Sequence, residues 1–153
     1  MKSAASGLVA AILLLSTGAQ ATENCIRASE VEADRVRYVE TQLKVAVFQC
    51  KDQRHAELGT LYKNFILENR PYLVGTRQAL GTYLARAGAA SLASYLDQIA
   101  DRISLESTRV NQFCNRAFLA AELSAKSPHP LTLLPLLPVN YQHPAPKCKP
   151  ARR

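Results

Sequence analysis

The stretch Val36–Cys50, VRYVETQLKVAVFQC, decides the fold of this chain. Its first apolar set recurs at spacings of three and four, which is typical of one stripe of an α-helix: Val36, Val39, Leu43, Ala46 and Cys50. A second set falls on a nearly opposite arc: Tyr38, Thr41, Val45 and Phe48. Because a surface helix needs only one apolar stripe, the pattern predicts a helix with neighbours on two sides.

Upstream of this helix, the chain begins like an export signal. Met1-Lys2 is a short basic region, and Leu8–Leu15 is an apolar run too short to span a bilayer as a mature helix. Ala19-Gln20-Ala21 supplies an A-x-A cleavage site. We therefore expect a signal peptide over residues 1–21, a mature chain that is not an integral membrane protein, and a periplasmic or secreted location. An uncleaved membrane anchor is the alternative.

The remaining pattern is helical throughout, which predicts an all-α fold. The first helix is expected from Ala28 to about Lys51, and a second carries apolar residues from Leu58 to Ala87, with a kink or split near Pro71 because proline lacks an N–H group. After a turn at residues 86–89, a third helix is expected from about Ala90 to Leu123. Three long antiparallel helices make an up-down bundle over residues 22–125.

The C-terminal segment, residues 126–153, differs in kind. It holds seven of the eight prolines and should be extended and partly polyproline-like. Within it, Leu131–Val139 (LTLLPLLPV) is as apolar as a core segment, which a free tail would not normally be. We expect it to pack against the arc formed by Tyr38, Val45 and Phe48.

The basic charge of the protein is concentrated in this tail. The chain has 19 Lys and Arg against 12 Asp and Glu, a net charge of +7. From Lys126 onward there are basic residues and no acidic one, so the body is nearly balanced. Specific nucleic-acid binding is therefore not expected. The basic end is instead a candidate contact with an envelope protein or an anionic surface.

Four cysteines follow the cleavage site, and an even count in an exported protein is typical of two disulfides. Cys25 and Cys50 stand at opposite ends of the first helix, nearly 40 Å apart at about 1.5 Å per residue. They cannot be bonded, because a disulfide needs Cα atoms within roughly 7 Å. Cys114 lies at the level of Cys50 in the bundle. Cys50–Cys114 with Cys25–Cys148 is the pairing that remains.

Candidate sites are few. His129, His143 and Cys148 offer soft metal ligands, but their spacing matches no compact metal motif. His55 is most simply a solvated loop residue. No catalytic residue and no cofactor is expected, because no recognisable nucleophile, phosphate-loop or zinc signature is present. The possible partner-binding set lies in the tail, where Pro135–Pro138 has P-x-x-P form: Leu131, Leu133, Leu134, Pro135, Leu136, Leu137, Pro138, Lys147, Lys149, Arg152 and Arg153.

Three short stretches carry a resemblance to a known group. Glu40–Cys50 (ETQLKVAVFQC), Tyr62–Phe65 (YKNF) and Phe113-Cys114 resemble a group of small exported bacterial helical proteins with a cysteine pair and no assigned activity. The resemblance implies the Cys50–Cys114 pairing and transfers no catalytic residue. The basic, proline-rich tail with Cys25 and Cys148 departs from that pattern.

These observations favour a non-enzymatic binding or structural protein of the cell envelope. The competing interpretation is an envelope hydrolase whose site is dispersed over the helices. A solvent-open cleft with several ionisable groups would favour the enzyme, whereas an apolar or basic surface patch would favour the binding protein.

Overall fold

The computed structural model describes residues 25–89, 91–143 and 145–148, and this part of the chain is all-helical. Its α-helices are α1 (Ala28–Gln49), α2 (Leu58–Glu68), α3 (Arg70–Arg86), α4 (Leu92–Ser107) and α5 (Phe113–Ser124), with two 3-10 helices, η1 (Gln53–His55) and η2 (Pro130–Leu136). None of the described helices is long and apolar enough to cross a membrane.

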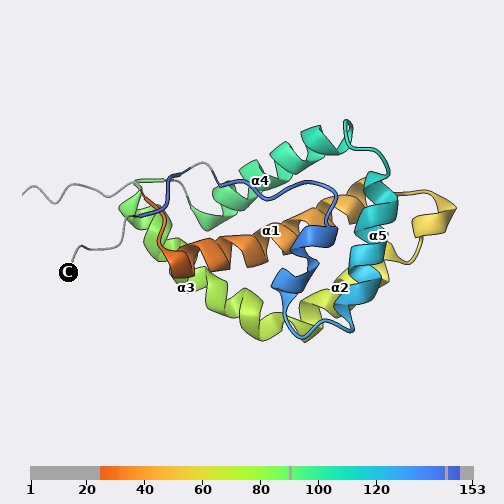
Figure 1. Ribbon diagram of the computed structural model, residues 1–153, viewed down its shortest axis with the longest axis horizontal. Coiled ribbons are helices and arrows are strands. Elements are labelled where there is room, and N and C mark those ends of the chain that lie inside the picture. The colour runs from red at the N-terminus through yellow and green to blue at the C-terminus, as the bar shows by residue number, and fades with distance from the viewer. Residues whose placement is uncertain (1–24, 90, 144, 149–153) are drawn as a thin grey trace, which may run out of the picture.

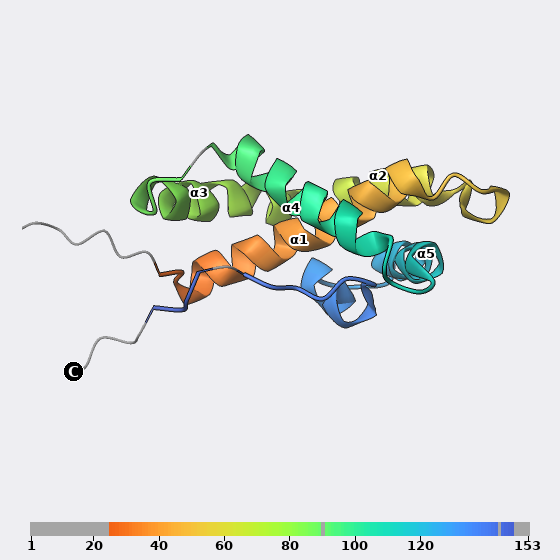
Figure 2. The ribbon, with the colours of Figure 1, turned by 90° about the horizontal axis from the view of Figure 1, so that it is seen from above.

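Helix α1 is the centre of the molecule and packs against α2, α3, α4, α5 and η2. It lies between α4 on one side and α2 and α3 on the other (Figure 1), and η2 lies on the side of α1 opposite α3 (Figure 2). Both of its predicted apolar arcs are used, since Val39 and Leu43 are fully buried and so is Tyr38 on the other arc. The prediction of neighbours on two sides is confirmed.

The break between α2 and α3 falls where the proline predicts it. Asn69 ends α2 and precedes α3, so Pro71 occupies the first turn of α3, where a missing N–H group has no cost. The Phe65 carbonyl accepts from both the backbone N–H and the side-chain amide of Asn69, each at 3.0 Å, which fixes the end of α2. Helix α3 ends at Arg86, and Gly88 in the following turn has φ +62°.

The continuous third helix predicted over Ala90–Leu123 is wrong. Its N-terminus is capped by the Ser91 hydroxyl, but α4 ends at Ser107 and α5 begins only at Phe113. Gln112 between them adopts φ 58° in the left-handed region, which a continuing helix cannot contain. The described residues therefore form five α-helices, and the three long helices of the predicted bundle are not seen; α5 folds back across the C-terminal half of α1 (Figure 1).

The apolar tail segment differs in conformation from the prediction. Much of it forms the 3-10 helix η2 instead of an extended, polyproline-like segment. Helix η2 begins where the His129 ring accepts a hydrogen bond from the Leu131 N–H group at 3.1 Å. Leu133 and Leu137 are each 1% exposed and pack into the core with α1 and α5. Within the arc predicted to be covered by the tail, Phe48 is 65% exposed, because it lies in the last turn of α1, where that helix ends.

Buried polar contacts fix the tail on α1. The Gln42 side chain is fully buried and exchanges two hydrogen bonds with the Val139 backbone, donating to the carbonyl at 2.9 Å and accepting from the N–H group at 2.8 Å. The Tyr38 hydroxyl donates to the Asn140 carbonyl at 2.9 Å. These bonds satisfy backbone groups that would otherwise be buried without partners.

Both disulfides form with the pairing predicted from the sequence. Cys50 of α1 is bonded to Cys114 of α5, with Cα atoms 5.6 Å apart, and Cys25 is bonded to Cys148, with Cα atoms 4.8 Å apart. Beside the second bond, Ile26 pairs with Lys147 in a parallel bridge. The tail therefore runs back along α1 to its beginning, as expected.

Candidate ligand groove

A hollow with a volume of about 710 Å³ lies between α1, α2 and α3. This volume is in the range of small-molecule sites, about 300–1,000 Å³. Its wall combines apolar and charged side chains: Arg37, Glu40, Tyr62, Lys63, Ile66, Leu67, Arg70, Leu73, Val74 and Arg77.

The order of residues along α2 and α3 explains why the hollow has an apolar wall. Each helix uses one face for the core, where Phe65 and Leu73 are buried. Leu67 comes two positions after Phe65 and Val74 one position after Leu73, so both fall outside the core face: Leu67 is 70% exposed and Val74 is 62% exposed. Two large aliphatic side chains are therefore open to solvent within one hollow.

Positive charge accumulates around the same hollow. Lys63 of α2 and two arginines of α3 line it, and those two, Arg70 and Arg77, are seven residues apart and so lie on a similar face of α3. All three are exposed, and none forms an ion pair or side-chain hydrogen bond within the described part of the chain. Their charge is therefore available to a ligand.

The single carboxylate of the groove is already engaged by its neighbours. Glu40 accepts a hydrogen bond from the Tyr62 hydroxyl at 2.7 Å and lies 3.7 Å from the Arg37 guanidinium. Arg37 in turn donates to the Thr76 hydroxyl and to the Leu73 carbonyl, both at 2.7 Å. Burial, together with the adjacent Glu40, raises the pKa of the Tyr62 hydroxyl, so it remains a donor at neutral pH.

A second polar cluster lies inside the protein and away from this groove. Asp34 is 1% exposed and accepts hydrogen bonds from the hydroxyls of Tyr95 at 2.8 Å and Tyr141 at 2.6 Å. His143 lies 3.8 Å from the same carboxylate. Burial raises the pKa of both tyrosines, which keeps them as neutral donors. Because the cluster joins α1, α4 and the tail around the buried Asp34, we assign it to holding these elements together.

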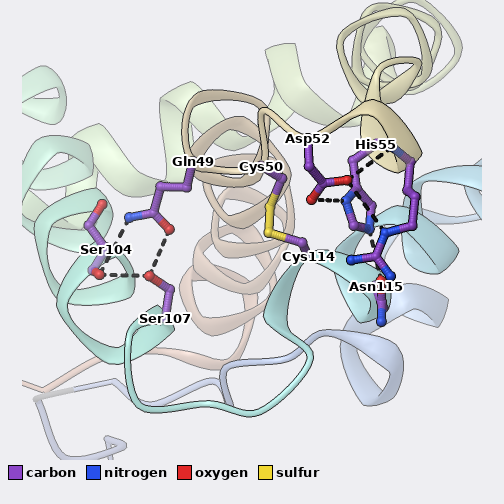
Figure 3. Close-up of a disulfide and its surroundings, with 9 residues drawn as sticks. Gln49, Cys50, Asp52, His55, Ser104, Ser107, Cys114 and Asn115 are labelled. Atoms are coloured by element: carbon purple, nitrogen blue, oxygen red, sulfur yellow. Dashed lines mark hydrogen bonds and ion pairs between the residues drawn. A yellow bond between two sulfur atoms is a disulfide. The ribbon is translucent and has the colours of Figure 1, made fainter.

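His55 is not a solvated loop residue, and the prediction to that effect is wrong. It is 4% exposed, its Nδ1 lies 2.8 Å from the Asp52 carboxylate and its Nε2 lies 2.9 Å from the Asn115 side-chain oxygen. These bonds join η1 to α5 beside the Cys50–Cys114 disulfide (Figure 3). The hydrogen bond from His55 lowers the pKa of Asp52.

On the other side of that disulfide, α1 is joined to α4. The Ser107 hydroxyl donates to the Gln49 side-chain oxygen at 2.7 Å, and the Gln49 amide donates to the Ser104 carbonyl at 3.4 Å (Figure 3). The disulfide thus lies between two sets of hydrogen bonds, one joining η1 to α5 and the other joining α1 to α4. We therefore assign this region a structural role.

The predicted partner-binding residues of the tail are divided by the structure. Leu133, Leu137 and Pro138 are buried in contact with the body, and Pro135 is exposed. Three others are half-buried: Leu131, Leu134 and Leu136. Lys147 is exposed, whereas Lys149, Arg152 and Arg153 lie outside the described residues.

The candidate metal ligands are not brought together. His129 meets the Tyr72 ring edge to face, His143 lies beside Asp34, and Cys148 is bonded to Cys25. Within the described residues, no group of three or more His, Cys, Asp or Glu side chains has the arrangement of a metal site.

Comparison with known proteins gives no relative to place beside this geometry. No family model matches the chain, and searches of curated proteins and of solved structures found no match. The groove is therefore interpreted from its own chemistry.

Proposed function

We propose that this protein is a non-enzymatic binding protein of the cell envelope, exported to the periplasm or secreted, and that the groove between α1, α2 and α3 is its ligand site. Two disulfides are typical of proteins that fold in an oxidising compartment. The expected signal peptide, residues 1–21, would account for export and lies outside the described residues.

The observation that carries the proposal is the exposure of Leu67 and Val74 inside a basic-rimmed hollow. An apolar pocket with a few charged groups at its edge is the common form of a small-molecule site. The described histidine–carboxylate pairs, at His55, His129 and His143, all lie outside the groove. The groove itself therefore offers apolar contact and charge, which suit binding.

The basic end of the tail is a separate part of this proposal. Lys147 is exposed next to the Cys25–Cys148 bond, and further basic residues follow it in the sequence. Their charge would attract an anionic envelope surface and hold the protein near it without adding specificity.

The groove can be tested with an environment-sensitive apolar dye, 1-anilinonaphthalene-8-sulfonate, titrated into the folded mature protein. We expect saturable fluorescence enhancement in the wild type and its loss in Leu67→Glu, which places a carboxylate in the apolar wall. Leu105→Glu is the matched control, because Leu105 is 59% exposed on α4 and does not line the groove.

Circular dichroism of each variant verifies that the helices remain formed. Equal dye binding by the wild type and both folded variants would place the dye elsewhere and refute the groove as the ligand site. Absence of saturable dye binding by the wild type would also refute the groove as the ligand site.

A further inference from the structure

We infer that the ligand of the groove is a single-chain amphiphile with an anionic head group, a carboxylate or a phosphate. This inference rests on the proposed function and specifies the chemistry of its ligand. Three features of the groove support it: its apolar wall, its unpaired positive rim and its limited size.

The apolar wall of the groove requires that part of the ligand be apolar. Ile66, Leu67, Leu73 and Val74 line the hollow without hydrogen-bonding side chains, and the Tyr62 hydroxyl is taken by Glu40. A fully polar ligand such as a sugar or an amino acid would leave its own groups without partners against this wall. An alkyl chain would cover the exposed Leu67 and Val74, and the removal of these side chains from water would stabilise the complex.

The charged side chains at the rim of the groove favour a ligand head group with negative charge. Four basic side chains and one carboxylate line the groove, and that carboxylate is bound by Tyr62 and Arg37. Arg37 is itself held by Thr76 and Leu73, so the unpaired charges are those of Lys63, Arg70 and Arg77. Carboxylate and phosphate are the groups that arginine binds with two parallel hydrogen bonds. A cationic head group would instead meet uncompensated positive charge.

The size of the hollow favours a lipid-like molecule over a helical peptide. An α-helix with side chains is about 10 Å across, so a volume of 710 Å³ accepts roughly six residues of one. Peptides that dock as amphipathic helices use anchors spread over at least positions i to i+7, which is more than this groove accommodates. An alkyl chain is much thinner and fits lengthwise.

The test is a panel of dodecyl compounds that differ only in their head groups, each below its micellar concentration: dodecanoate, dodecyl phosphate, dodecyltrimethylammonium and dodecyl maltoside. Binding to the mature protein is measured by calorimetry and by displacement of the dye, since the chain has no tryptophan to report directly. We expect both anionic compounds to bind at least about tenfold more tightly than the neutral and cationic ones. The ratio between carboxylate and phosphate separates a fatty acid from a single-chain phosphate lipid, such as a lysophosphatidic acid, as the source.

Two matched double variants test the role of the rim. Arg70→Gln/Arg77→Gln removes two rim charges, and Arg109→Gln/Lys126→Gln removes two exposed charges away from the groove. Exposed ion pairs each change affinity by roughly 1.5- to 5-fold. We therefore expect the rim variant to weaken dodecanoate binding by roughly 2- to 25-fold and to leave dodecyl maltoside unchanged, with no effect of the control. Raising the salt concentration should weaken only the anionic compounds.

The failures of the two proposals are distinguishable. Equal affinity for all four head groups, with no effect of the rim variant, would overturn the anionic amphiphile and leave the groove as a binding site. Displacement of the dye by an acidic amphipathic peptide, with no binding of any dodecyl compound, would overturn it in favour of a peptide ligand. Failure of both the dye and the panel would overturn the binding function itself.

Discussion

Truncation of Leu137 to alanine in the mature protein tests whether the proline-rich tail is part of the core. Leu137 is 1% exposed, follows η2 and packs with residues of α1 and α5. Its carbonyl accepts a hydrogen bond from Arg116 of α5 at 2.8 Å, so the segment is also held by a polar contact. The variant removes apolar atoms and leaves the backbone contacts in place.

The expected magnitude follows from the burial of this side chain. Alanine lacks three of the carbon groups of leucine, which are worth about 0.8 kcal/mol each on transfer from water, or about 2.4 kcal/mol together. The cavity that remains adds a further penalty, because surrounding atoms relax only partly, and buried leucines lose about 2–5 kcal/mol on truncation. We therefore expect Leu137→Ala to lower the free energy of unfolding by about 3 kcal/mol, a large share of the 5–15 kcal/mol typical of a domain.

The assay is equilibrium unfolding in urea with both disulfides intact, followed by circular dichroism at 222 nm. Leu105→Ala is the control, because Leu105 is 59% exposed and should change the free energy by less than about 0.5 kcal/mol. If Leu137→Ala unfolds at the same urea concentration as the control, the segment contributes nothing to the core. Leu131–Val139 would then be free to dock on a partner, and the packing described above would be refuted.

Four further changes test the contacts that hold the fold. Gln42→Ala removes both hydrogen bonds to the tail backbone and should cost about 2 kcal/mol, measured in the same urea assay. Arg86→Met removes the two hydrogen bonds of 2.7 and 2.8 Å that Arg86 donates to the buried Glu30 carboxylate and should cost about 3 kcal/mol at pH 7. The hydrogen bond from Arg86 lowers the pKa of Glu30 below its ordinary 4.5, so its contribution is fully present above pH 4.5 and is lost as the pH falls through the lowered pKa. Glu30→Gln should therefore be destabilising at pH 7 and less so as the pH falls below 4.5. Replacing Cys50 and Cys114 by serine opens a loop with a sequence separation of 64 residues and should cost about 4 kcal/mol, whereas an unchanged urea midpoint would contradict the bond.

The helices that carry strong local signals could be predicted from the sequence, and so could the disulfide pairing. The apolar arcs of α1 and the proline in the first turn of α3 act within a few residues, and these elements agree with prediction. The break before α5 could not be predicted from apolar periodicity. Apolar residues continue at helical spacing through Val110 and Phe113, although the backbone turns at Gln112. Its cause is tertiary, because α5 must fold back to pack on α1 and α2.

Burial at single positions was harder to predict than the helices. His55 is polar and lies in a polar segment, and only the approach of α5 supplies its partner Asn115 and covers it.

The groove was not predicted from the sequence, because two of its apolar residues are exposed instead of buried. Leu67 and Val74 fall outside the stripe that defines the core face, and this surplus of apolar residues between basic ones was the available signal. The hollow itself depends on the junction at Asn69 and on the position of α1, which no local pattern specifies.

The Cys25–Cys148 bond has a mechanical consequence for the folded body. It joins the two ends of the described body, and residues 26–147 form a closed loop behind it. A tension applied between the N-terminal and C-terminal ends of the chain passes through this covalent bond and not through the helices. The body, with its groove, would therefore carry no load if the chain were tethered at both ends, and its unfolding under force would require reduction of a single bond first.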